Sequence, residues 1–137
     1  MKKFIAILCI LASIFGIFGC SDSSYQVTEV ANITMSISDV SSVGATVTIT
    51  DTNNNQEMYG EWYEIEKEIN GKWRKIKTKE DAYFNLLGYL PDQNDQIIFH
   101  IDWEWLYGKL PAGNYRLLKE IGSMDNKQYI AVEFEIQ

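Results

Sequence analysis

Cysteine and histidine are scarce in this sequence, which has two cysteines and one histidine among 137 residues. Both cysteines, Cys9 and Cys20, lie in the first twenty residues, so the rest of the chain has no thiol for a disulfide. A zinc site needs several nitrogen or sulfur ligands, and one histidine without a free cysteine cannot supply them. We therefore expect a domain that binds no cofactor and is stable through its core alone.

Motifs for catalysis are missing as well. His100 is the one candidate base for a Ser-His mechanism, but alternation places it on the outer face of a strand, and no Gly-x-Ser-x-Gly motif accompanies it. Glu64, Glu66 and Glu68 could act as the paired carboxylates of a glycosidase, but they are predicted to face lysines across a hairpin. A solvated charged face is the better interpretation. We predict that the protein is not an enzyme, and a carbohydrate hydrolase is the weakest alternative.

The segment that follows residue 50 begins like a calcium-binding loop, but its later positions do not fit one. Asp51-Thr52-Asn53-Asn54-Asn55 places oxygen ligands at alternate positions, as such a loop requires. Gln56 stands where the loop needs glycine, and Trp62 stands where it needs glutamate. A polar hairpin tip is therefore the better prediction, with a weak ion site as the alternative.

The sequence has one long hydrophobic run, from Phe4 to Phe18. Its fifteen residues are fewer than the roughly 20 that a helix needs to span a bilayer. Two lysines precede the run, and Gly19-Cys20 followed by polar residues ends it, which is the order of a secretory signal. We therefore predict a signal peptide over residues 1–19.

The tetrapeptide Ile17-Phe18-Gly19-Cys20 resembles the lipobox of bacterial lipoproteins, which ends in a small residue and a cysteine. The resemblance implies that Cys20 becomes the new N-terminus and carries a lipid on its thiol. The partner would then be the cell membrane, reached from its extracytoplasmic side. An anchor with two or three acyl chains needs no second membrane signal. The alternative is a cysteine that happens to end an ordinary signal peptide, which would give a secreted soluble protein.

Positive charge is scarce after the predicted signal peptide. The whole chain has 12 basic and 19 acidic residues, and the loss of Lys2 and Lys3 takes its net charge from −7 to −9. Nucleic acids and anionic lipid headgroups both require basic patches, so we expect the domain to bind neither. The same charge would suit an inhibitor of a basic envelope-attacking protein such as a lysozyme, which is our alternative function.

Alternation of apolar and polar residues predicts strands over most of residues 28–137, which we take as one domain after a lipidated N-terminus and linker over 20–27. Asn70-Gly71 predicts a two-residue hairpin turn that sets Ile69 opposite Lys72 and Glu66 opposite Lys75. Residues 80–95 fit a short helix as well as a strand. About seven short strands separated by turns favour an antiparallel β-sandwich. The strand-like stretches are 33–38, 45–50, 59–77, 97–103, 113–121 and 130–136.

Several segments resemble an immunoglobulin-like domain found in surface lipoproteins of Gram-positive bacteria. They are Tyr63-Glu64-Ile65-Glu66-Lys67, Asn70-Gly71-Lys72-Trp73, Tyr107-Gly108-Lys109-Leu110-Pro111-Ala112-Gly113-Asn114-Tyr115-Arg116 and Phe134-Glu135-Ile136. The resemblance runs from about Ile33 to the C-terminus, and it implies an all-β immunoglobulin-like sandwich, a cell-surface context and no catalytic residues. Tyr115 suits the tyrosine corner of such sandwiches, and an ordinary core position is an equal alternative for it.

Trp62 and Trp73 are predicted to lie on the outer face of the hairpin. Exposed indoles stack on sugars or anchor protein partners, so these two residues are candidate contacts for a protein or glycan at the cell surface. The alternative is that they cover a sheet edge or the region 80–95. The sequence thus predicts a lipid-anchored, extracytoplasmic binding or structural module of the bacterial cell envelope.

Overall fold

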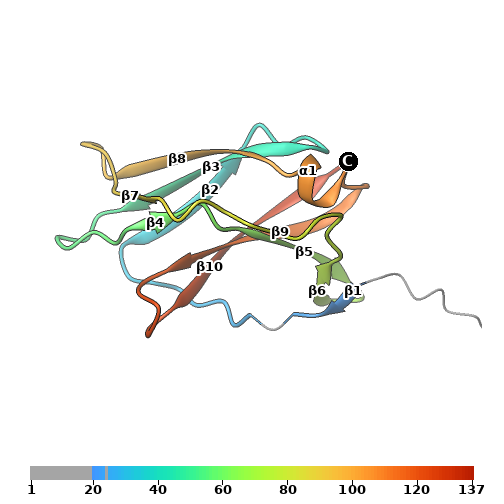
Figure 1. Cartoon of the computed structure of the whole chain (residues 1–137), viewed down its shortest axis with the longest axis horizontal. Coiled ribbons are helices and arrows are strands. Elements are labelled where there is room, and N and C mark those ends of the chain that lie inside the picture. Colours follow the sequence, from blue (N-terminus) through green and yellow to red (C-terminus); the bar gives the residue numbers. More distant parts are fainter. Residues whose placement is uncertain (1–19, 24) are drawn as a thin grey trace, which may run out of the picture.

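Two antiparallel sheets face each other in the computed structural model, which describes residues 20–23 and 25–137 (Figure 1). The predicted signal peptide lies outside the described residues. The larger sheet has the order β1-β6-β5-β9-β10, the smaller β2-β3-β8, and a short pair β4-β7 stands apart. Within these residues seven of the ten strands have five or more residues, and the prediction of an all-β antiparallel sandwich is confirmed. The strands are β1 (Cys20–Asp22), β2 (Ile33–Ser38), β3 (Gly44–Asp51), β4 (Tyr59–Gly60), β5 (Glu64–Ile69), β6 (Lys72–Ile76), β7 (Gly88–Tyr89), β8 (Gln96–Asp102), β9 (Gly113–Ile121) and β10 (Gln128–Ile136).

The core lies between the two sheets and follows the alternation of the sequence. In β3 the side chains of Ala45, Val47 and Ile49 are buried, whereas the threonines between them are half-buried. Across the sandwich, β5 and β9 contribute the fully buried Ile65 and Leu117. Burying each large aliphatic side chain contributes roughly 1.5–3 kcal/mol. Apolar packing is therefore the main source of stability in this domain.

The tyrosine corner is present. The Tyr115 hydroxyl donates a hydrogen bond to the carbonyl oxygen of Pro111 over 2.5 Å, and the ring is 1% exposed. The ring also stacks on Phe134, which in turn stacks on the buried Trp103, with centroid distances of 5.6 and 5.4 Å. Tyr115 therefore links the start of β9 to the core in the way that a tyrosine corner requires.

The hairpin of β5 and β6 has the predicted register. Asn70 and Gly71 have φ values of 53° and 76°, which suit a two-residue turn. Ile69 lies opposite Lys72, and Glu66 lies opposite Lys75, as predicted. The prediction of a solvated face is wrong at Glu66, because this side chain is fully buried. The cause lies outside the hairpin, in the segment that covers it.

The N-terminal segment runs across the outer face of the larger sheet (Figure 1). It begins as β1, which pairs with β6, and Ser23 then donates its N–H to the carbonyl oxygen of Trp73 over 3.2 Å. Further along, Thr28 donates its N–H to the carbonyl oxygen of Tyr129 on β10 over 2.9 Å. The segment that we expected as a linker over 20–27 is thus hydrogen-bonded to β6 near one edge of the sheet and, through the next residue, Thr28, to β10 at the other edge.

The region 80–95 forms neither a helix nor a long strand. Residues 77–87 have no regular structure, and the two residues of β7 pair with β4. The short helix α1 (Glu104–Tyr107) follows β8, and the Asp102 carboxylate accepts a hydrogen bond from the N–H of Glu104 at its start. Within the described residues no helix is long and apolar enough to cross a membrane.

Candidate interaction surface

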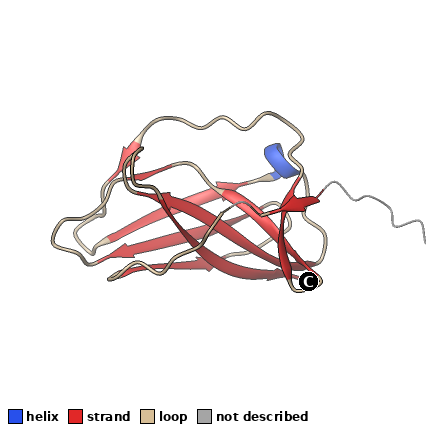
Figure 2. Ribbon diagram, turned by 90° about the horizontal axis from the view of Figure 1, so that it is seen from below, coloured by secondary structure: helices blue, strands red, loops and turns tan. Residues whose placement is uncertain are grey.

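The segment 77–90 crosses the open side of the sandwich between the two sheets (Figures 1 and 2). Its backbone is tied to the fold by the Lys79 N–H, which donates to the carbonyl oxygen of Leu106 over 2.7 Å, and by the β4-β7 pair. Phe84 is half-buried and contacts the rings of Tyr63 and Trp105 at centroid distances of 5.3 and 6.1 Å. One aromatic side chain therefore fixes the middle of a segment that has few backbone hydrogen bonds.

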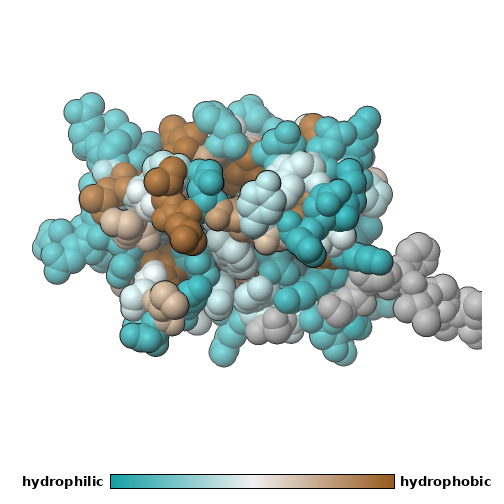
Figure 3. Space-filling view, in the orientation of Figure 1, coloured by the Kyte–Doolittle hydropathy of each residue, from teal (hydrophilic) through white to brown (hydrophobic). Residues whose placement is uncertain are grey.

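Most apolar side chains of this segment point away from the core. Leu86 is fully exposed, and Tyr83, Leu87 and Leu90 are 82, 60 and 63% exposed. Hydrophobic side chains gather on this face of the molecule, over β4, β7 and β8 (Figure 3). We call these four residues, together with the exposed Met58, Tyr89, Ile98 and Trp105, the apolar surface. Soluble proteins rarely leave such a group of large apolar side chains in water unless it serves an interaction.

A hollow of about 290 Å³ lies beside the apolar surface. Aromatic rings form most of its walls, and two carboxylates, those of Glu61 and Asp102, also line it. The Tyr89 hydroxyl donates to Oε1 of Glu61 over 2.8 Å, and this hydrogen bond raises the pKa of Tyr89. The full lining is Glu61, Tyr63, Tyr83, Phe84, Asn85, Phe99, His100, Ile101, Asp102 and Trp105.

His100 lies in this hollow without a catalytic partner among the described residues. Its Nδ1 is 3.3 Å from Oγ1 of Thr46, which lies opposite it on β3. A threonine hydroxyl held by one imidazole lacks the orienting carboxylate of a catalytic triad. The contact is therefore a cross-strand hydrogen bond on the exposed face of the smaller sheet.

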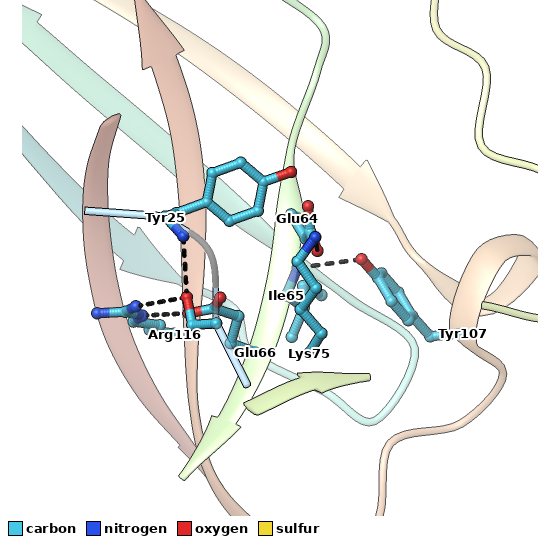
Figure 4. A network of polar contacts seen from close by, with 8 residues as sticks. Tyr25, Glu64, Ile65, Glu66, Lys75, Tyr107 and Arg116 are labelled. Carbon is cyan, nitrogen blue, oxygen red and sulfur yellow. Dashed lines mark hydrogen bonds and ion pairs between the residues drawn. The ribbon is translucent and has the colours of Figure 1, made fainter. Parts of the chain in front are cut away.

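Two of the three glutamates of β5 form ion pairs with basic residues (Figure 4), whereas Glu68 is exposed and lies opposite Trp73. Nε of Arg116 lies 2.6 Å from Oε2 of the buried Glu66, and Nζ of Lys75 lies 3.6 Å from Oε1 of Glu64. The N-terminal segment also contributes to this network, because Nη2 of Arg116 donates a hydrogen bond to the Ser23 hydroxyl over 3.4 Å. Both carboxylates are thus engaged in ion pairs with basic side chains.

The residues that begin like a calcium loop form a hydrogen-bonded turn. The buried carboxylate of Asp51 accepts hydrogen bonds from the N–H of Asn53, the N–H of Glu57 and the hydroxyl of Tyr59. Burial acts to raise the pKa of Asp51, but these hydrogen bonds together lower it. Within residues 20–23 and 25–137 no group of three or more candidate side chains could hold a metal ion. The prediction of a hairpin tip is wrong, because β3 pairs with β2 and β8 whereas β4 pairs with β7. The segment is a connection between two sheets that the Asp51 carboxylate stabilises.

The two candidate tryptophans are both half-buried, and neither lines the hollow. Trp62 contacts the rings of Tyr25 and Tyr129 at centroid distances of 5.6 and 5.8 Å. The guanidinium of Arg116 lies over Trp73, 4.8 Å from the ring centroid. Each indole thus has an intramolecular contact, and the exposed aromatic and leucine side chains come from segment 83–90 and from Trp105 instead.

A family model described as a bacterial Ig-like domain matches residues 28–135. The chain belongs to this family. Searches of curated proteins and of solved structures each returned no match. Bacterial Ig-like domains are generally non-catalytic binding or structural modules.

In this Ig-like domain most residues of the apolar surface belong to segment 77–90, whose backbone crosses one side of the sandwich (Figure 2). Sequence reasoning missed it because residues 80–95 fit two periodicities and were not assigned to a face. The only signal was compositional, since five large apolar residues, Tyr83, Phe84, Leu86, Leu87 and Leu90, lie within eight positions just before Pro91. That composition does not tell a buried segment from an exposed one, so the apolar surface is known from the exposure of these side chains in the structure.

Proposed function

We propose that this Ig-like domain is a non-enzymatic binding module of the bacterial cell envelope. In this proposal Cys20 carries the lipid that holds the domain outside the membrane, and the apolar surface binds a protein partner. The anchor is supported by the lipobox-like sequence that ends at Cys20. The binding role is carried by one observation, the group of exposed leucine and aromatic side chains in segment 83–90.

The chemistry of the apolar surface favours a protein over a glycan. Leucine side chains have no polar atom with which to bind the hydroxyl groups of a sugar, and three of the four central residues are leucines. Covering each of these side chains would contribute about 1.5–3 kcal/mol, so a few of them supply much of the affinity of a typical interface. An inhibitor of a basic envelope-attacking protein would be one special case of this module.

Site-specific cross-linking on intact cells tests this function. A photo-reactive amino acid replaces Leu86, and in a control it replaces Met124, which is also exposed but lies on the turn between β9 and β10. We expect a discrete cross-linked protein with the probe at Leu86 and none with the probe at Met124. Equal patterns from both positions, or no adduct from either, would contradict a binding role for the apolar surface.

A further inference from the structure

We infer that the hollow beside the apolar surface takes a cationic side chain, Arg or Lys, from a basic protein segment whose apolar residues cover the apolar surface. This inference rests on the proposed function and adds the chemical class of the partner. It follows from the lining of the hollow, from the charge of the surrounding chain and from the absence of a cation that already serves the two carboxylates.

The lining combines two kinds of group that bind a cation. Tyr83 and Trp105 bring aromatic rings to the hollow, with their centroids 6.3 Å apart, and aromatic faces attract cations. Glu61 and Asp102 bring carboxylates, which form charge-assisted hydrogen bonds with guanidinium or ammonium groups. The aliphatic stem of an arginine or lysine can lie along the rings while its charged end reaches a carboxylate.

The chain around the hollow has no cation of its own to satisfy these carboxylates. Between Lys79 and Lys109 the sequence has no Lys or Arg. The same stretch has six acidic residues, which are Glu80, Asp81, Asp92, Asp95, Asp102 and Glu104. In the described part of the chain the ion pairs use other carboxylates, those of Asp22, Glu64, Glu66 and Glu120. A partner therefore meets uncompensated negative charge next to exposed leucines.

Lys119 lies close to the hollow, but its side chain is buried and does not line it. Its Nζ lies 3.9 Å from the ring centroid of Phe99, which lines the hollow, and donates to the carbonyl oxygen of Gly60 over 2.6 Å. The side chain is 1% exposed, and burial lowers its pKa to about 7. Near neutral pH it is thus only partly charged, so it leaves much of the negative charge of Glu61 uncompensated.

Binding of a synthetic peptide that alternates arginine and leucine tests the inference. The wild-type domain is titrated with this peptide by calorimetry, and the indole N–H of Trp105 is followed by NMR. A peptide with glutamate in place of arginine is the charge-reversed control. We expect the arginine peptide to bind and to shift the Trp105 signal, the glutamate peptide to do neither, and affinity to fall as salt screens the charges.

Two double variants with the same loss of charge locate the interaction. Glu61→Gln with Asp102→Asn removes the carboxylates of the hollow and keeps the acceptor atoms for Tyr89 and for the start of α1. Glu133→Gln with Glu135→Gln removes two exposed carboxylates of β10 on the other sheet. We expect the first variant to bind the arginine peptide at least about tenfold more weakly, and the second to bind like the wild type.

Three results would overturn the inference. The first is equal weakening by both double variants, which would indicate general charge attraction. The second is a Trp105 shift caused by a neutral chito-oligosaccharide and not by the arginine peptide, which would assign the hollow to a glycan. The third is an undiminished cross-link at Leu86 on cells carrying Glu61→Gln and Asp102→Asn, which would leave the proposed binding module intact. If the domain with the wild-type hollow gave no cross-link at Leu86, the proposed binding module itself would be contradicted.

Discussion

Nε of Arg116 lies 2.6 Å from Oε2 of Glu66, and the two side chains of this ion pair are 12% and 0% exposed. The pair lies on the outer face of the larger sheet, which would be exposed to water if only the β5–β6 hairpin were present. The pair belongs to neighbouring strands, because Glu66 of β5 lies opposite Arg116 of β9. Trp73 packs against the guanidinium, and Ser23 of the N-terminal segment bonds it from above. The outer face of the larger sheet is therefore a second layer of packed side chains.

Breaking this pair should destabilise the domain strongly. Arg116→Met leaves the Glu66 carboxylate buried without its counter-charge, and we expect a loss of about 3–5 kcal/mol in the free energy of unfolding. The double variant Arg116→Met with Glu66→Leu should recover most of that loss, because no buried charge remains. Urea denaturation of the three proteins measures both effects.

Lys127→Met is the matched control for the buried pair, since Lys127 forms an exposed ion pair with Glu120 at 3.0 Å. Exposed pairs contribute about 0–1 kcal/mol, so this variant should unfold at nearly the wild-type urea concentration. A similar loss from Lys127→Met and Arg116→Met would contradict the burial of Glu66.

Lys119 should make stability depend on pH. Burial lowers its pKa from 10.5 in the unfolded chain to about 7 in the folded one, so between these values the unfolded chain binds more protons. Stability should therefore rise as pH increases from 7 toward 10, by up to about 1.4 kcal/mol per pH unit. The penalty is fully present below pH 7. Burial raises the pKa of Tyr63 to about 12, so stability should fall again above pH 10.

Lys119→Met tests the source of this pH dependence by urea denaturation at pH 7, 8 and 9. We expect its free energy of unfolding to change little over this range, because methionine does not titrate. Lys72→Met, at the exposed first residue of β6, should keep the wild-type slope. An unchanged slope in Lys119→Met would assign the proton to another group.

The tyrosine corner should contribute measurably to stability. Tyr115→Phe removes the hydroxyl that donates to the carbonyl oxygen of Pro111, and we expect a loss of about 1–2 kcal/mol. Tyr83→Phe removes a hydroxyl from a side chain that is 82% exposed and should change stability by less than about 0.5 kcal/mol. Thermal denaturation compares the two variants, and equal melting temperatures would contradict a structural role for the Tyr115 hydroxyl.

The proposed anchor predicts a lipid on one atom, the sulfur of Cys20. Cells that express the whole chain are grown with a fatty-acid analogue that can be labelled, and the protein is then isolated. The wild type should carry the label and fractionate with membranes, whereas Cys20→Ser should do neither. Cys9→Ser is the control, because Cys9 lies inside the predicted signal peptide and should leave labelling unchanged. Equal labelling of the wild type and Cys20→Ser would exclude the anchor.

The parts of the fold that depend on neighbouring residues could be predicted from the sequence. The turn at Asn70-Gly71 fixed the register of its hairpin because both residues adopt positive φ there. The alternation in β3 likewise marked Val47 and Ile49 as core residues. In each case the pattern and the structure that it determines lie within about ten residues of each other.

The burial of Glu66 and the positions of the tryptophans depend on contacts between distant segments. Nothing near Glu66 in the sequence indicates that Ser23 and Arg116 will cover it. Trp62 was expected on an outer face, free for a partner, but Tyr25 and Tyr129 pack against it. Alternation indicates toward which face of the sheet a side chain points. It does not indicate whether another segment covers that face and buries the side chain.

Cys20 opens strand β1, and its backbone is already part of the sheet, opposite Ile76. A lipid on this residue would pass from the bilayer straight into a hydrogen-bonded strand, with no freely jointed stretch in between. Only the single bonds of the Cys20 side chain and of the lipid would then separate the sheet from the membrane. The domain would be held close to the membrane surface, and a partner would have to fit the narrow space around it.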